Sequence, residues 1–515
     1  MPHNDTVDGS QTPRLTAVLV ALMSLCGCAV GPDFHRPAAP TGAGYTIAPP
    51  SAGDAQHFSE GQNMAFKWWE SFGSPALNSL VEQAFRANPT LRAAQASLRQ
   101  AQELVYAQQG YFYPSVAANY SFERQKLAGN LSGSSAPGDQ GNGTSIVAVQ
   151  TPTSPYNEPL YYNFHTAQLT VGFTPDVFGA NRRKVESLAA QADYQRFEME
   201  ATYVTLASNV VAAAIQEASL RAQIAATRQI IDCNEKSLQV LLDKFKQGYA
   251  MRIDVALQEQ QTAQARALLP PLESAFEQTL DLLRALAGKL PNQELAEHFE
   301  VTDLTLPLDL PLSVPSRLIE QRPDVRAAEA QLHSANADVG VAVAAMLPQF
   351  SITGAVGGTA TTFGYMFRHG GPFWDVIGNV TQPVFAGGTL LHTKRAADQA
   401  LLQAAAQYQS AVITAYQNVA DTLHAIVADA GEYTATDTAA RAAEVALGVT
   451  REKMQDGYTD YLTELAAEMN YQQAMIIRLQ AQATRFGDTA ALYQALGGGW
   501  WNRHDQAAAT AADRR

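Results

Sequence analysis

The sequence is poor in several features that define common protein classes. Its 515 residues hold three cysteines, Cys26, Cys28 and Cys233, which argues against a disulfide framework. The body of the chain lacks any run of about 18 apolar residues, which argues against a helical membrane span there. Lys and Arg number 35 against 49 Asp and Glu, and the net charge of -14 argues against a nucleic-acid partner. This charge suits either an ordinary acidic protein or an acidic lumen that favours cationic solutes.

Catalytic and metal-binding motifs are also missing. The ten histidines form no H-E-x-x-H or H-x-x-x-H pair, and the sequence has neither a phosphate loop nor a G-x-S-x-G elbow. His333 and His424 lie in helical stretches, where we expect packed or solvated side chains rather than metal ligands. The sequence therefore predicts no enzyme, no catalytic residue and no metal.

The N-terminus has the pattern of a lipoprotein signal. Leu15 to Leu25 is an apolar run of 11 residues, which suits a signal peptide and is too short to span a bilayer. It leads into Leu25-Cys26-Gly27-Cys28, which resembles a bacterial lipobox. We expect residues 1–27 to be removed and Cys28 to carry covalent lipid, with no other cofactor. Two alternatives are a plain signal peptide with a coincidental cysteine and, because Asp5 and Asp8 are unusual there, a mis-assigned start codon.

The body of the chain is duplicated. Asn88 to Leu98 (NPTLRAAQASL) aligns with Arg322 to Leu332 (RPDVRAAEAQL) at six of eleven positions. Lys236 to Tyr249 aligns with Val445 to Tyr458, and both segments end in Gly-Tyr. A duplication of this length indicates a fold built from two similar units. We expect a first helix–strand–strand–helix repeat at 77–288, a linker at 289–317 and a second repeat at 318–497.

Each repeat contains short segments that alternate apolar and polar residues. They lie at 116–123 and 167–173 in the first repeat, and from Phe350 to Val356 and at 376–385 in the second. Period two predicts strands with one face toward lipid and the other toward water, although a sandwich edge is the alternative. The stretch 127–160 is rich in Gly, Ser and Pro and predicts a loop.

Aromatic residues crowd these segments and suit the girdles at membrane interfaces. They are Tyr111, Phe112, Tyr113, Tyr161, Tyr162, Phe363, Tyr365, Phe367, Phe373 and Trp374. Four strands cannot close a membrane barrel, whose known minimum is about eight, and unpaired strand edges are prohibitive in lipid. The strand count therefore predicts a trimer with twelve strands.

Long helices accompany the strands. Residues 181–247 contain no proline or glycine, which predicts a helix about 100 Å long. A second long stretch, 389–456, is expected to be broken at Gly431 and Gly448. Within it we predict a coiled-coil seam, formed by Ile413, Tyr416, Ala420, Leu423 and Val427. The shorter stretches 254–287 and 77–112 together match one long helix, which predicts a barrel of helices.

Several motifs resemble the TolC-like outer-membrane efflux factor family, in its NodT-like lipoprotein branch. They are CAVGPDFHRP after the lipobox, KWWESFGSPALNSLV at 67–81, FGANRR at 178–183, QPVFAGGTL at 382–390 and LYQALGGGW at 492–500. The Trp-Trp pair alone is more often a packed core element. The likeness covers essentially all of 28–501, and Ala29 after the cysteine suggests sorting to the outer membrane.

The resemblance implies an α+β membrane protein. Three chains would form a twelve-stranded outer-membrane β-barrel, four strands per chain, continuous with a long α-helical periplasmic barrel. The lipidated N-terminal strap at 28–76, the linker and a C-terminal tail at 498–515 would build an equatorial region. The implied function is a passive exit duct for small toxic molecules or drugs, driven by an inner-membrane pump through a periplasmic adaptor. A type I protein-secretion duct and a non-conducting, periplasm-spanning structural lipoprotein are the alternatives.

Two turns farthest from the strands are expected at the periplasmic tips. Gly248-Tyr249 and Gly457-Tyr458 mark these turns, because glycine allows a sharp reversal. Candidates for gate contacts follow them: Arg252, Asp254, Asp460 and Tyr461. Ordinary helix caps, such as Asp254 at a helix start, are the alternative. Thr459 stands where the resemblance implies a gate-bridging arginine, so any bridge here must use other residues.

Overall fold

The computed structural model describes residues 29–38, 44–46, 56–127, 160–368 and 370–503. The chain divides into two compact units, each of which gathers segments from both halves of the sequence. The first unit combines the described residues of Met1–His35, Gln100–Ala192 and Gln331–Ala405. The second combines those of Arg36–Arg99, Asp193–Ala330 and Ala406–Arg515. The predicted signal peptide, Cys28 and nearly all of the predicted loop at 127–160 lie outside the described residues.

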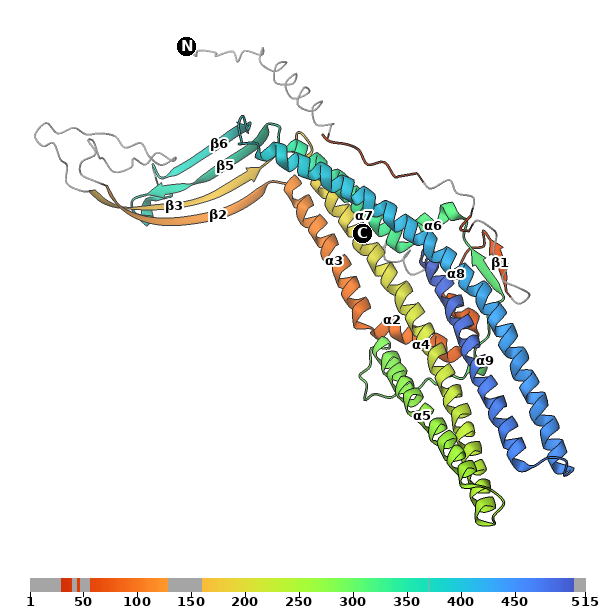
Figure 1. The fold of residues 1–515 in the computed structure, drawn as a ribbon. Helices are drawn as coiled ribbons and strands as arrows, with labels where there is room; N and C mark the ends of the chain where they lie inside the picture. Colours follow the sequence, from red (N-terminus) through yellow and green to blue (C-terminus); the bar gives the residue numbers. More distant parts are fainter. Residues whose placement is uncertain (1–28, 39–43, 47–55, 128–159, 369, 504–515) are drawn as a thin grey trace, which may run out of the picture. The chain divides into compact units, whose positions relative to one another are not determined.

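The first unit contains a four-stranded antiparallel sheet (Figure 1). In sheet order its strands are β2 (Ser115–Leu127), β3 (Leu160–Phe173), β5 (Gln349–Ala360) and β6 (Pro372–Thr381). All four predicted strands are confirmed, but the expected position of β6 at 376–385 is wrong by four residues. The strand ends before Pro383, because proline has no amide hydrogen to offer a neighbouring strand.

Two long helices follow the two pairs of strands. They are α4 (Ala180–Lys246) and α8 (Thr389–Gln455), each of 67 residues, so each is about 100 Å long. The predicted breaks at Gly431 and Gly448 are wrong, because α8 continues through both. Both glycines are exposed, and a glycine inside a helix costs only about 1 kcal/mol relative to alanine.

Shorter helices complete each repeat. Helices α5 (Arg252–Leu286) and α9 (Tyr461–Ala495), each of 35 residues, form hairpins with the long helices. The remaining α-helices of the described residues are α2 (Pro75–Ala87), α3 (Pro89–Gln109), α6 (Pro315–Gln321) and α7 (Pro323–Ala344). Asn88 and Arg322 separate α2 from α3 and α6 from α7 with extended backbone, since a residue before proline disfavours the helical conformation. Among the described residues, no helix is both long and apolar enough to cross a membrane.

The buried seam of α8 differs from the predicted one. Over 404–426 its buried members are Ala404, Tyr408, Val412, Ala415, Val419, Leu423 and Ile426. Leu423 belongs to both sets, but Ile413 is 68% exposed and Val412 beside it is buried. The predicted row is displaced by one residue from the buried row at most positions, because an Ala-rich helix offers several apolar rows with similar spacing.

The N-terminal segment and the linker meet in the second unit. Strand β1 (His57–Glu60) pairs in parallel with β4 (Asp309–Leu312), and short 3₁₀ turns lie at η1 (Trp68–Phe72) and η3 (Val301–Asp303). The Trp-Trp pair is a packed core element: Trp68 and Trp69 are buried, and the Trp68 ring stacks on Tyr493 at 5.1 Å.

The C-terminal glycine motif closes the second unit. Gly497, Gly498 and Gly499 have φ values of 95°, 66° and 69°, which side chains other than glycine rarely adopt. They lead into η5 (Trp500–Asn502), where Trp500 Nε1 donates to the Gln321 carbonyl at 2.6 Å. The glycine turn therefore allows Trp500 to bind the last residue of α6.

Candidate functional site

The strand register gives the sheet one apolar and one polar face. Antiparallel partners point to the same side of a sheet. One row crosses all four strands through Ala118, Leu169, Val356 and Trp374. The adjacent row crosses them through Asn119, Gln168, Gly357 and Phe373. The two faces predicted from the alternation are therefore present on a single sheet.

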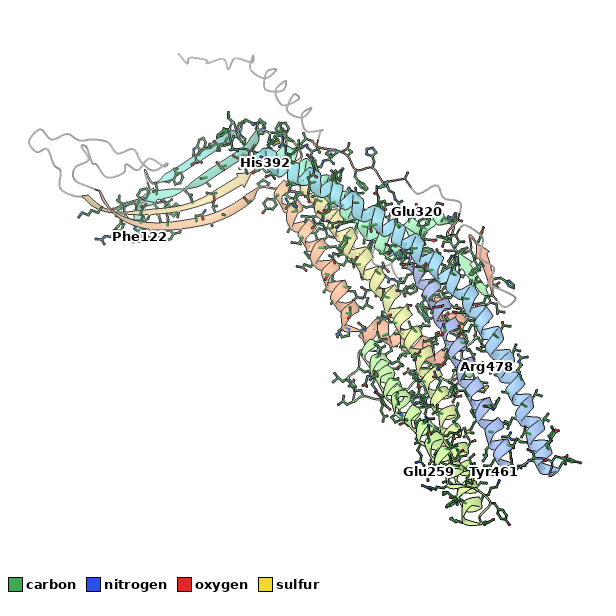
Figure 2. The ribbon with its side chains drawn as sticks, in the orientation of Figure 1. Phe122, Glu259, Glu320, His392, Tyr461 and Arg478 are labelled. Carbon is green, nitrogen blue, oxygen red and sulfur yellow. The ribbon has the colours of Figure 1, made fainter. Side chains whose placement is uncertain are left out.

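The apolar face is wide and exposed in the single chain. Besides the first row it carries Val116, Tyr120, Phe122, Val171, Ile352, Val376 and Val380 (Figure 2 labels Phe122). A continuous exposed apolar surface of this kind marks contact with a partner or with lipid. The polar face carries Ser121, Thr166, Thr170, Thr353, Asp375 and Asn379, which suit contact with water.

Aromatic residues lie at both ends of the sheet. Tyr111 and Tyr113 lie in and after η2 (Gly110–Phe112), immediately before β2, whereas Phe363, Tyr365 and Phe367 lie in and after η4 (Phe363–Tyr365), between β5 and β6. The 12 residues of β5 extend about 40 Å, or about 28 Å of thickness at a tilt of 45°. That thickness matches a hydrocarbon core of about 30 Å. Phe373 departs from the girdle expectation, because the register puts it on the polar face; the side chains of Tyr161 and Tyr162 lie outside the described residues.

The sheet has two open edges. Within the described residues, β2 pairs only with β3, and β6 pairs only with β5. Each outer edge therefore presents a row of backbone donors and acceptors without strand partners. Such edges invite pairing with another chain, and in lipid they require it.

The two Gly-Tyr turns have the same backbone geometry. Gly248 (φ 79°) and Gly457 (φ 77°) adopt the left-handed conformation after α4 and α8. The amides of Tyr249 and Tyr458 each donate 2.8 Å back to a lysine carbonyl, of Lys244 and Lys453 respectively. Both tyrosine side chains are 82% exposed at the ends of the hairpins. The sequence prediction of two sharp turns is therefore confirmed, and their role at a periplasmic tip stays a prediction.

The two aspartates after the turns act as helix caps. Asp254 Oδ2 accepts from the Met251 amide at 2.8 Å, at the start of α5. Asp460 Oδ1 accepts from the Thr463 amide at 3.0 Å, at the start of α9. For Asp254 this is the contact expected from the alternative interpretation, an ordinary cap. Arg252 approaches Glu259 of its own helix at 3.6 Å.

Asp460 also joins the two hairpins. Its Oδ2 lies 3.8 Å from Nζ of Lys244, at the end of α4. In the part of the chain that the structure describes, this is the one ion pair between the α4/α5 and α8/α9 hairpins. The hydrogen bonds from Thr463, and then the charge of Lys244, lower the pKa of Asp460 below its usual value. Sequence reasoning missed Lys244, because it precedes the turn by four residues and nothing in the sequence links it to the other repeat.

A second contact joins the same two helices. Gln480 Nε2 of α9 donates to Gln223 Oε1 of α4 at 2.8 Å. Figure 2 labels Tyr461 and Glu259 near the ends of the two hairpins, and Arg478 farther along α9. The hairpins thus meet along α4 and α9 through polar side chains.

The described residues contain no cluster of three or more metal-ligating side chains. His333 Nε2 lies 2.9 Å from Glu186 Oε1, and its ring stacks on Phe34 at 4.3 Å, so of the two expectations, packed or solvated, it is packed. Cys233 is buried, and burial raises the pKa of its thiol to about 11, which keeps it protonated and unreactive at neutral pH.

Comparison with known proteins matches this architecture. The chain is 28% identical over 494 residues to the pyoverdine export outer membrane protein OpmQ of Pseudomonas putida, covering 95% of this chain and 98% of that protein. It is 26% identical over 507 residues to the probable efflux pump outer membrane protein TtgC of P. putida, covering 96% and 98%.

Solved structures share the fold. The outer-membrane channel OprN superposes with a TM-score of 0.76 at 26% identity, covering 92% of this chain and 100% of that one. The Campylobacter jejuni CmeC outer membrane channel gives a TM-score of 0.79 at 19% identity, covering 94% and 98%. The sequence model of the outer membrane efflux protein family matches residues 80–289 and 314–498. The chain therefore belongs to the outer membrane efflux protein family and is an outer-membrane component of an efflux system.

Proposed function

We propose that three copies of this chain form a closed duct across the outer membrane and into the periplasm. The observation that carries this proposal is the four-stranded sheet, with one apolar face, one polar face and two open edges. Because β2 and β6 run antiparallel, β6 of one chain can pair with β2 of the next without breaking the alternation of strand direction. Three copies give twelve strands around a polar lumen, continuous with a barrel built from the long helices.

The duct works without catalysis or metal. An inner-membrane pump supplies the energy, a periplasmic adaptor docks on the helical end, and transport through the lumen is passive. Lipid on Cys28 adds an anchor to the barrel, and no other cofactor is needed. The repeats at 77–288 and 318–497 contribute the walls, while 28–76, 289–317 and 498–515 contribute the equatorial region.

The gate lies at the helical tips. Tyr249, Tyr458 and Tyr461 supply aromatic rings there, and Arg252 supplies charge. The Lys244–Asp460 pair holds the two hairpins together in the closed state, in place of a bridge at Thr459. Since the pKa of Asp460 is lowered, the pair is intact at neutral pH and is lost only as the pH falls through that lowered pKa.

Single-channel recording in planar bilayers tests both the duct and the gate. At neutral pH we expect the purified trimer to open rarely. Lys244→Ala should raise the open probability at least several-fold, because it removes a contact that opposes opening. An exposed ion pair contributes less than about 1 kcal/mol to folding, so the variant should still fold. Lys246→Ala is the matched control, since Lys246 pairs with Asp243 of its own helix at 3.0 Å. Persistent absence of openings in all three proteins would contradict the channel.

Cargo class distinguishes the proposal from its alternatives. We expect deletion of the gene to sensitise cells to small toxic molecules or drugs, as befits a relative of proteins named for pyoverdine export and for efflux. Loss of secretion of a single protein would instead indicate a type I secretion duct. A periplasm-spanning structural lipoprotein would give neither phenotype and no conductance.

A further inference from the structure

Two of the sequence motifs, far apart along the chain, bind each other in the first unit. Residues 29–34 come from the motif that follows Cys28, and we call them the strap segment. Their partners are the turn Phe178–Gly179 between β3 and α4, the first turns of α4, and α7. Sequence reasoning treated the two motifs as separate signs of family likeness, because nothing in either sequence indicates the pairing.

Arg183 is the centre of this contact. Its Nε donates to the Val30 carbonyl at 3.1 Å, and its Nη2 donates to Asp33 Oδ1 at 2.7 Å and to the Gly31 carbonyl at 3.4 Å. Its Nη1 donates to Glu186 Oε2 at 2.8 Å. Arg183 is only 5% exposed, so without the strap segment its buried guanidinium would lose most of its hydrogen-bond acceptors.

Backbone contacts on either side of Arg183 fit the strap segment closely. The Val30 amide donates to the Phe178 carbonyl at 3.1 Å. A side chain on Gly340 would collide with Arg183 and the Val30 carbonyl, and one on Gly179 would collide with Ala29. The Phe34 ring stacks on His333 of α7, which in turn binds Glu186. The strap segment is therefore held by charge, by backbone hydrogen bonds and by shape.

The position of the contact matters for lipidation. Gly179 contacts Ala29, and the ring of the preceding Phe178 lies 6.3 Å from that of Phe350 at the start of β5, so Ala29 is held near the end of the sheet. Lipid on Cys28 would be attached one residue before Ala29, so the contact that holds Ala29 would limit the reach of the acyl chains. Acyl chains on Cys28 would then enter the membrane at a fixed place relative to the strands, rather than at the end of a free tether.

We propose that Arg183, with Gly179 and Gly340, forms a docking site for the strap segment that fixes where the lipid anchor meets the membrane. Arg183 is thus a positioning residue for the acylated N-terminus. The proposal rests on lipidation of Cys28, as set out under the proposed function. It predicts that the strap segment and the acyl group act together during assembly of the trimer in the outer membrane.

Hydrogen exchange of the full-length protein tests the docking. We expect Arg183→Ala and Asp33→Ala each to speed exchange of the Val30 amide about tenfold, with no change within 200–240 of α4. Asp33 has an exposed side chain, so its substitution tests the contact even if Arg183→Ala folds poorly. Lys184→Ala is the matched control, because Lys184 joins α4 to α7 through Asp338 at 3.3 Å without touching the strap segment. Unchanged exchange at Val30 in both variants would overturn the docking site.

A double-mutant comparison tests the positioning role. The yield of trimers in the outer membrane is measured for wild type and Arg183→Ala, with lipidated Cys28 and with Cys28→Ser behind an ordinary secretory signal. We expect Arg183→Ala to lower the yield several-fold only when the acyl group is present. An equal loss in both backgrounds would mean that Arg183 merely stabilises the fold, and no loss in either would mean that docking does not matter; both results overturn the proposal. If the channel proposal alone is wrong, wild type shows no conductance while the Arg183 effect remains.

Discussion

The two helical hairpins have the same lengths but different interiors. A separation of 209 residues relates Gly248 to Gly457 and Gly288 to Gly497, and it places each residue of one hairpin on the other. The first hairpin has Leu220, Ile224 and Phe276 at the positions where the second has Asp429, Tyr433 and Arg485. Leu220 and Asp429 are both buried. At these three positions, therefore, the first hairpin is apolar and the second is polar or charged, although the first also has a buried carboxylate one turn away, Glu217, which pairs with Arg221.

The polar contacts nearer the tips differ in the same way. In the first hairpin, Gln258 Nε2 donates to Asn234 Oδ1 at 3.0 Å, a neutral pair that is buried. In the second, Arg451 of α8 binds both Glu464 and Glu468 of α9. Neutral buried contacts respond little to pH or salt, whereas charged ones respond to both. We infer that, at these corresponding positions, the stability of the second hairpin responds more strongly to pH and salt than that of the first.

The largest loss of stability is expected when a charge is placed at the apolar positions of the first hairpin. Leu220→Asp introduces a buried carboxylate with no partner, and we expect it to lower the stability of the first hairpin by about 4 kcal/mol. Hydrogen exchange of the α4 and α5 amides gives this local free energy of opening. A loss of less than about 1 kcal/mol would show that water reaches this level of the hairpin and that the interior is not apolar.

Removing the charge from the second hairpin should raise its stability, by an amount that depends on pH. Burial, and then the neighbouring Asp488, raise the pKa of Asp429 to about 7. In the unfolded chain an aspartate titrates near pH 4, so between about pH 4 and pH 7 the folded hairpin keeps a proton that the unfolded chain releases. The second hairpin therefore loses stability as the pH rises through this window.

Asp429→Asn should abolish that dependence. We expect unchanged stability at pH 4 and a gain of roughly 2 kcal/mol at pH 8, read from exchange of the α9 amides after correction for intrinsic rates. The α5 amides of the same protein serve as the internal control, because Asp429 lies in the other hairpin and its substitution should leave their pH dependence unchanged. A gain that is equal at both pH values would contradict the raised pKa of Asp429.

The ion pairs inside the hairpins should give effects no larger than this, and the exposed one in the first hairpin should give the smallest. Arg451→Ala leaves Glu464 and Glu468, whose side chains are only 17% and 16% exposed, without that partner, and we expect a loss of about 2 kcal/mol. Arg266→Ala in the first hairpin removes a 2.7 Å pair with Glu235, whose side chain is 45% exposed, and should cost less than about 1 kcal/mol. Equal losses in local exchange would show that the two hairpins do not differ in this respect.

Local sequence patterns predicted most of the elements but not how they meet. The absence of proline and glycine predicted α4 to within a residue or two at each end. In contrast, α5 contains Pro270 and Pro271, and α8 contains Gly431 and Gly448, yet both helices are continuous. Packing along the hairpin compensates for such residues, and a propensity argument that considers one helix alone does not include that packing.

Contacts between distant segments were the part that the sequence could not predict. The turns at Gly248 and Gly457 were found because glycine reports its own backbone conformation. Lys244, which pairs with Asp460, and Arg183, which binds the strap segment, were missed because a basic residue on a helix has the same sequence pattern whether it is solvated or paired. Only the fold brings such partners together.

The central claim is that open sheet edges of three chains close one barrel, and cysteine cross-linking across those edges tests it most directly. Ser121→Cys on the polar face of β2 is combined in turn with Asp375→Cys, Ile377→Cys or Asn379→Cys on β6, in outer membranes under oxidising conditions. We predict that at least one combination gives covalent dimers and trimers and nothing larger, while each single substitution gives neither. Absence of cross-links in every combination, or a ladder extending beyond trimers, would contradict a closed barrel of three chains.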